Sequence, residues 1–310
     1  MKFGYQNPSF SWPSGEYAIW EETKKSALWA EANGFDSFWL MDHFIQLPGV
    51  GEADEPFLEG WSGLAALAAV TSRIRLGTLV TGAPYRNPAL LAKMAASIDV
   101  ISQGRLIFGY GAGWFQTEFE QYGYEFVEPP YKRIKAMREG LIIIKKMWTE
   151  ARASFEGEYY TIREAICEPK PVQKPHPPIL IGGSGEKYTL RYLAELGDAC
   201  NLFGPFDVVQ GKLEVLKQHC ADLGRDYDEI LKTKYDPYFI RETAAEIEAM
   251  PWTTEFNQSG FGLAGSAEQV IERINRWTEM GIDYITLSNP QNDEETNRLL
   301  AEVVLPAVSD

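Results

Sequence analysis

The chain has 310 residues, of which 45% are hydrophobic, and a formal net charge of −15. This size suits a single large barrel domain with a complete core, and the acidic balance argues against nucleic acid or anionic membrane partners, since both need a basic surface. The three widely spaced cysteines (Cys167, Cys200 and Cys220) give no disulfide framework, which predicts a reducing, cytoplasmic location. No apolar run reaches the roughly 18 residues of a membrane span.

Strand-like and helix-like segments alternate along the chain. Strands are expected at Lys2–Gln6, Phe35–Met41, Ile74–Thr81, Leu106–Tyr110, Ile179–Ile181, Asp198–Leu202, within Leu231–Ile240 and at Asp283–Leu287. Helices are expected at Glu16–Ala32, Trp61–Thr71, Pro88–Ser102, Tyr131–Trp148, Glu186–Leu196, Val208–Leu223, Ser266–Met280 and Glu294–Val304. This order predicts an α/β fold, a (β/α)8 TIM barrel forming one domain over residues 1–310, with a doubly wound open sheet as the alternative.

One segment breaks the alternation. Residues Ser154–Pro178 begin with a hairpin pattern around Glu156-Gly157 and continue into a proline-rich stretch that favours neither helix nor central strand. We therefore expect an insertion between strands 4 and 5. Residues Glu242–Leu263 are expected to form a loop or a short helix.

A glycine-rich turn follows the fifth expected strand. Gly182, Gly183, Ser184 and Gly185 lead into a helix expected from Glu186, so several backbone N–H groups and a helix dipole point at one spot that suits a phosphate. The net charge gives an anion no general attraction, so these local groups would have to hold it. The alternative is an ordinary strand-to-helix turn whose glycines only permit tight backbone angles.

The ends of other strands carry further candidates, because barrel enzymes gather their chemistry there. Asp42 and His43 directly follow the strand FDSFWLM, and histidine exchanges protons near neutral pH. The alternative is a structural histidine paired with Asp42. His176 and His219 are expected to be structural. No metal site is predicted, since no histidine or cysteine pair has ligand spacing.

Two more strand ends are rich in glycine or proline. Gly111 and Gly113 follow the fourth strand and would let a flat ligand approach the backbone, with Trp114 as a wall. The spacing is a poor match to a dinucleotide fingerprint. The segment Leu79–Pro84 predicts a bulged strand exit.

Four segments together carry a resemblance: WLMDH, RIRLGTLVTGAPYRNPALLAK, DVISQGRLIFGYGAGWFQTEFEQYG and PHPPILIGGSGEKYTLRYLAELGDACN. They resemble the luciferase-like monooxygenase superfamily, from Met1 to at least Gly224. The resemblance implies a TIM barrel with an insertion, usually a homodimer, that binds a flavin or deazaflavin. The Asp42-His43 pair and the GGSGEKYTLR turn look closest to oxidoreductases that use coenzyme F-420, an 8-hydroxy-5-deazaflavin.

The resemblance also implies roles for individual residues. Asp42 and His43 would lie beside the deazaflavin ring, a non-proline cis peptide would fall at or next to Leu79-Val80, and the glycine turn would hold the phosphate. His43 is the catalytic residue predicted in this way, and Trp114 belongs to the substrate pocket. The predicted cofactor-binding residues are Asp42, Leu79, Val80, Thr81, Gly111, Ala112, Gly113, Gly182, Gly183, Ser184, Gly185 and Glu186.

One departure bears on the substrate. The sugar-phosphate dehydrogenases of this branch carry a glutamate where this chain has Trp114 and an aromatic residue where it has Leu47, so a more apolar or aromatic small molecule is expected. The predicted function is hydride transfer between F-420 and that substrate, with His43 moving the coupled proton. Two alternatives stay open: an FMN-dependent monooxygenase that uses oxygen, and a non-catalytic cofactor-binding protein.

Overall fold

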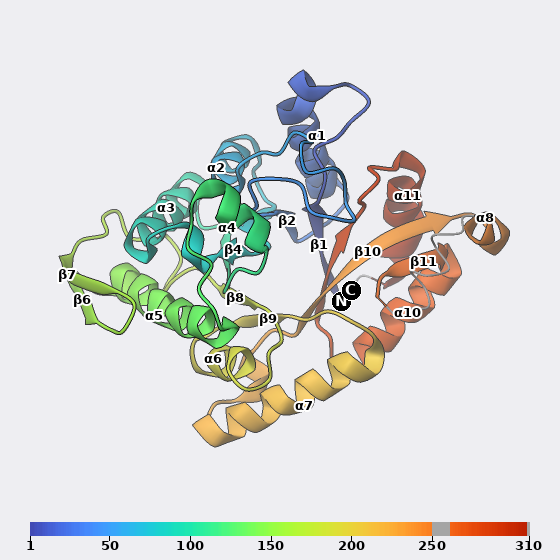
Figure 1. Ribbon diagram of the computed structural model, residues 1–310. Helices are drawn as coiled ribbons and strands as arrows, with labels where there is room; N and C mark the ends of the chain where they lie inside the picture. The colour runs from blue at the N-terminus through green and yellow to red at the C-terminus, as the bar shows by residue number, and fades with distance from the viewer. Residues whose placement is uncertain (250–260, 309–310) are drawn as a thin grey trace.

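The structure, a computed structural model, describes residues 1–249 and 261–308. Eight parallel strands form the central ring, with helices around it (Figure 1). The ring strands are β1 (Lys2–Asn7), β2 (Ser37–Leu40), β3 (Arg75–Thr78), β5 (Leu106–Gly111), β8 (Ile179–Gly182), β9 (Ala199–Asn201), β10 (Thr233–Arg241) and β12 (Tyr284–Ser288).

The ring closes between β9 and β10. Leu202 N–H donates to the Thr233 carbonyl at 2.9 Å, Tyr235 N–H donates to the Leu202 carbonyl at 3.1 Å, and Cys200 N–H donates to the Leu231 carbonyl at 3.0 Å. The other neighbours follow the order β10-β12-β1-β2-β3-β5-β8-β9. The predicted (β/α)8 barrel is therefore confirmed, and the open-sheet alternative is wrong.

The helices cover the outside of the ring (Figure 1). Several begin with side-chain caps: Asn87 accepts hydrogen bonds at the start of α3, and Ser266 forms a capping box with Gln269 at α10. The helices are α1 (Ile19–Ala32), α2 (Gly60–Val70), α3 (Pro88–Ile101), α4 (Gln116–Tyr122), α5 (Pro130–Thr149), α6 (Thr189–Leu196), α7 (Phe206–Leu223), α8 (Ala244–Glu248), α10 (Ala267–Glu279), α11 (Glu294–Leu299) and α12 (Leu305–Val308). Short segments are η1 (Glu16–Ala18), η2 (Ala83–Tyr85), η3 (Tyr227–Glu229) and the π-helical η4 (Leu300–Val304).

One end of the barrel interior is filled by a tryptophan. Trp39 packs with Ile107, Leu180 and Ala199, one inward residue from each of four strands. A Cβ at Gly77 would lie 2.4 Å from the Trp39 ring, so this glycine makes room for the indole. Because side chains alternate along a strand, the residue two positions further along each of these four strands also points into the barrel. An open cavity begins at that level, above the Trp39 ring.

The chain departs from the predicted elements in a few places. The third strand ends at Thr78, and the short strand β4 (Thr81–Gly82) pairs with β5. Between them the Leu79-Val80 peptide is cis, which confirms the position that the family resemblance implied. Helix α4 and strand β11 (Leu263–Ser266), which pairs with the end of β10, have no counterpart in the sequence prediction. The short helix expected in 242–263 is α8; residues 250–260 of that segment lie outside the described residues.

The predicted insertion between strands 4 and 5 is confirmed. It contains a hairpin of β6 (Ala153–Glu156) and β7 (Thr161–Ala165), which lies beside α5 at the outside of the ring (Figure 1). None of the helices within residues 1–249 and 261–308 combines the length and hydropathy that a bilayer crossing requires.

Candidate functional site

A cavity of about 600 Å³ lies at the carboxyl ends of the barrel strands. Its lining contains thirteen of the fourteen predicted site residues, so the structure brings together strand ends that are far apart in the sequence. These are Asp42, His43, Leu79, Val80, Thr81, Gly111, Ala112, Gly113, Trp114, Gly182, Gly183, Ser184 and Gly185. Lining residues that sequence reasoning missed include Gln6, Asn201, Phe203 and Tyr235.

His43 is held by a buried carboxylate from helix α4. Its Nδ1 lies 2.8 Å from Oε2 of Glu118, a fully buried residue of α4. Oε1 of Glu118 accepts the backbone N–H groups of Phe44 and Ile45, and Oε2 also accepts the Tyr85 hydroxyl. Sequence reasoning missed Glu118, and the possible Asp42–His43 pairing is wrong.

The Glu118 contacts determine which ring nitrogen of His43 carries the hydrogen. Burial alone would raise the pKa of Glu118, but the hydrogen bonds from His43, Tyr85 and the Phe44 N–H outweigh it and hold the pKa below its usual value. An ionised carboxylate can only accept, so Nδ1 of His43 carries the hydrogen. Nε2 is then left as the free nitrogen of a ring that lines the cavity.

Asp42, the neighbouring residue, is paired differently. Arg86 donates Nη1 to Asp42 Oδ2 at 2.6 Å and Nη2 to Oδ1 at 2.9 Å, a bidentate pair. Arg86 also binds Glu59, whose carboxylate caps the start of α2. Two acidic side chains thus hold one guanidinium next to the cavity. This places Asp42 rigidly in the lining.

The base of the cavity is built around Val80. A Cβ at Gly111 would lie 2.8 Å from a Val80 methyl, and one at Gly182 would lie 2.5 Å away. These glycines therefore make room for Val80, a reason that differs from the predicted approach of a ligand to Gly111. The Thr81 hydroxyl is bonded to Thr78 and accepts the Trp61 indole N–H at 2.9 Å, so this hydroxyl is engaged within the protein.

The glycine turn is open towards the cavity. The backbone N–H groups of Ser184 and Gly185 donate to no residue in the described part of the chain, whereas the Gly183 N–H belongs to the ladder in which Gly182 pairs with Asn201 of β9. Gly183 has φ +102°, a left-handed conformation that favours glycine. Helix α6 begins at Thr189, three residues later than expected.

Glu186 is the predicted site residue that lies outside the cavity lining. Its carboxylate pairs with Lys212 of α7 at 2.6 Å, and its carbonyl lies 2.7 Å from Nε2 of His219. Both contacts anchor the turn to α7, so Glu186 contributes to the turn's position. His219 is structural here, as expected.

The cavity also contains buried polar atoms without a partner. Oδ1 of Asn201 and Oε1 of Gln6 accept no hydrogen bond in the described part of the chain, although both residues are at least 97% buried. Buried acceptors of this kind normally have a partner. They are therefore available to a polar ligand. Across the described ranges, no three His, Cys, Asp or Glu side chains converge as metal ligands would.

The sequence is similar to proteins that carry curated names. An F-420-dependent glucose-6-phosphate dehydrogenase of Amycolatopsis mediterranei is 33% identical over 304 residues, covering 87% of this chain and 88% of the relative. An uncharacterized protein of Mycobacterium tuberculosis is 29% identical over 283 residues, covering 87% and 88%. These matches span nearly the full length of each relative.

Solved structures share the fold. A monooxygenase from Streptomyces bottropensis superimposes with a TM-score of 0.83 at 23% identity over 99% of both chains. An F-420-dependent secondary alcohol dehydrogenase, solved with an F-420–acetone adduct, gives 0.82 at 22% identity over 100% of this chain and 99% of that chain. At these identities the likeness concerns the barrel alone.

The family model for luciferase-like monooxygenases matches residues 1–251, well over half of the chain. The resemblance inferred from the four sequence segments is thereby confirmed, and the barrel and its insertion agree with it. The chain belongs to the luciferase-like monooxygenase family.

Proposed function

We propose that the protein transfers a hydride between the deazaflavin coenzyme F-420 and a small organic substrate. One observation carries the proposal: within the described residues, a single cavity joins the unbonded backbone amides of Ser184 and Gly185 to a histidine whose Nε2 makes no hydrogen bond. The names of the curated relatives, including one that is 33% identical, support the deazaflavin. The predicted homodimer and the small-molecule substrate stay predictions.

The residues present fit such a cofactor. Two unbonded amides in a turn before a helix suit a phosphate group. The unpartnered Asn201 and Gln6 oxygens can accept N–H groups from a heterocyclic ring. Val80 offers an apolar surface at the base of the cavity on which a flat ring can lie. Together these groups match an anionic chain attached to a planar, polar-edged ring.

A bound deazaflavin supplies a ring carbon that accepts or gives a hydride. The protein moves the proton. Glu118 keeps the hydrogen of His43 on Nδ1, so Nε2 can take the proton of a substrate hydroxyl during oxidation and return it to an oxygen during reduction. The charge of Glu118 favours the imidazolium that forms when Nε2 takes that proton.

Other residues orient the reactants. The bidentate Arg86 contact prevents Asp42 from rotating, so its position in the lining is fixed before any ligand arrives. Trp114 stands edge-on to His43, with ring centroids 5.9 Å apart, and forms a wall of the cavity beside it. The arrangement is thus set for proton transfer at one place.

Cofactor titration tests the proposal. Purified protein is titrated with F-420 and with FMN by calorimetry, and we expect F-420 to bind at least about tenfold more tightly. The variant Gly183→Ala strains the turn and turns its amides away, so its F-420 affinity should fall about tenfold. Gly211→Ala, in a helix with nothing within 4 Å of the added carbon, is the matched control and should change nothing.

The two alternative functions predict different results in the same experiment. Tighter binding of FMN, with oxygen consumption by the loaded protein, would replace this proposal with the flavin monooxygenase alternative. Tight F-420 binding without hydride transfer to or from any of a broad set of alcohols and carbonyl compounds would favour the non-catalytic alternative.

A further inference from the structure

The cavity lining carries little formal charge. Apart from His43, its titratable charge comes from Asp42, which Arg86 neutralises. No Lys or Arg side chain lines the cavity within the described residues, and residues 250–260 contain neither residue type in the sequence. A phosphorylated substrate needs such cations, because desolvating a phosphate without a partner is costly.

Three cations around the cavity are already engaged. The Arg133 guanidinium lies 3.9 Å from the Phe126 ring centroid, and Arg133 Nη1 donates to the Val127 carbonyl at 2.6 Å. Arg86 is held by two carboxylates, and Lys212 is held by Glu186. A second anion that used one of these three cations would have to break its present contact.

Within the described residues, the cavity offers one position for an anion. That position is the pair of unbonded amides of Ser184 and Gly185, and under the proposed function, on which this inference rests, the cofactor's phosphate occupies it. The segment that follows the lining residues Leu47 and Val50 is acidic, with Glu52, Asp54 and Glu55. These carboxylates add repulsion against a further anion at the cavity mouth.

The walls near His43 are apolar or aromatic. Trp114 stacks on Phe115 with ring centroids 5.3 Å apart and is 61% exposed, so it has a large face to cover. Leu47 and Val50 come from the loop after β2, and Phe203 lies 6.0 Å from Tyr235 between ring centroids. Burial of an apolar skeleton against these side chains would be favourable.

We infer that the substrate is a neutral, largely apolar alcohol, or the carbonyl compound formed from it, and not a phosphorylated sugar. In the oxidation direction the C–H bond breaks and its hydride goes to the deazaflavin, the O–H proton goes to Nε2 of His43, and a C=O bond forms. The deazaflavin is reduced and the alcohol is oxidised. Reduction of the carbonyl runs through the same steps in reverse.

A matched pair of alcohols tests the inference. After F-420 affinity has been established by titration, the loaded protein is given 4-methylcyclohexanol or 4-hydroxycyclohexyl phosphate, which share a free ring hydroxyl and differ in charge. Binding is measured by calorimetry and kcat/KM by deazaflavin reduction. We expect the neutral alcohol to bind at least tenfold more tightly and to react at least a hundredfold more efficiently.

Variants locate the effect. Val50→Lys places a cation in the lining and should narrow the difference in kcat/KM between the two alcohols at least tenfold. Trp114→Ala should weaken binding of the neutral alcohol. Val70→Lys, at the exposed end of α2, is the matched control and should leave the difference unchanged. Equal or better use of the phosphate compound, or binding of neither alcohol, would overturn the inference. If the protein still binds F-420, the proposed function is unaffected by that result. Failure to bind F-420 would overturn the proposed function itself.

Discussion

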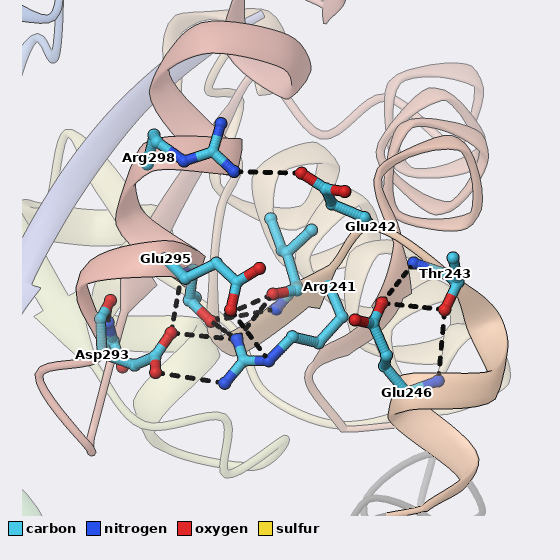
Figure 2. Close-up of polar contacts among 10 residues, drawn as sticks. Arg241, Glu242, Thr243, Glu246, Asp293, Glu295 and Arg298 are labelled. Atoms are coloured by element: carbon cyan, nitrogen blue, oxygen red, sulfur yellow. Dashed lines mark hydrogen bonds and ion pairs between the residues drawn. The ribbon is translucent and has the colours of Figure 1, made fainter.

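Two clusters of arginine and carboxylates stand at the carboxyl ends of barrel strands, and they serve different purposes. Arg86 joins Asp42 and Glu59 beside the cavity. Figure 2 shows the other cluster, in which Arg241 at the end of β10 binds Asp293 at 2.9 Å and also contacts Glu295. Both contain a bidentate pair, so the pairing alone does not identify a functional site.

The two clusters differ in how deeply their aspartate side chains are buried. The Asp42 side chain is fully buried, and burial outweighs Arg86 and raises its pKa. Burial acts on Asp293 too, but that side chain is 25% exposed, and the hydrogen bonds from Arg241 and Thr296 prevail and lower its pKa. Asp293 also caps α11, whereas Asp42 lines the cavity. We conclude that the Arg241 cluster fastens a helix and the Arg86 cluster orients a site.

The largest expected effect is at the cavity. His43→Ala should lower kcat about 10³-fold, because it removes the group that moves the proton, and should leave F-420 affinity within about twofold. Stopped-flow measurement of hydride transfer and calorimetry check the two parts. Unchanged turnover would remove His43 from the mechanism.

Glu118→Gln should lower kcat about 10²-fold, less than the loss of His43 itself. The amide keeps the shape but can present N–H to His43, which disturbs the hydrogen on Nδ1. Because the pKa of Glu118 is lowered in the folded protein, its stabilisation is present above the ordinary carboxyl value and is lost as pH falls through the folded value. The variant should therefore lose less stability on acidification, which urea unfolding from pH 7 to pH 3 can measure. An identical pH dependence in the two proteins would contradict this.

Asp293→Asn sharpens the contrast between the clusters. We expect a loss of about 1 kcal/mol at pH 7, given the partial exposure of the pair, with kcat per folded molecule unchanged. The folded pKa of Asp293 is lowered, so the loss should shrink as pH falls below the ordinary value of about 3.8. Thermal unfolding together with active-site titration separates stability from activity. A fall in kcat would mean that the Arg241 cluster reaches the site.

Glu31→Gln is expected to have the smallest effect. Partial burial would raise the pKa of Glu31, but N–H groups of Ile74, Arg73 and Ser72 outweigh it and lower the pKa to about 2. The carboxylate holds the turn before β3, far from either cluster along the chain. The variant should lose under about 1 kcal/mol at pH 7, and the difference should disappear between pH 4.5 and 2. Denaturant midpoints across that range measure it.

Local patterns were enough to predict the eight barrel strands, the glycine turn and the Asp42-His43 strand end. Each depends on residues adjacent in the sequence: an apolar run, a turn without side chains, or a polar pair after a strand. The resemblance to a family added the site assignments, and all but Glu186 line the cavity. Glu186 differs because a partner from α7, Lys212, binds its carboxylate.

Only the tertiary structure decided which groups meet. Glu118 lies 75 residues after His43, and Arg86 lies 44 residues after Asp42; no local pattern distinguishes these two residues from the many other charged ones. The reason for Gly111 and Gly182 is likewise a contact with Val80, which lies between β3 and β4. Sequence periodicity specifies which way a side chain points along its own strand, but pairing between strand ends depends on how the ring closes, and ring closure is a property of the whole chain.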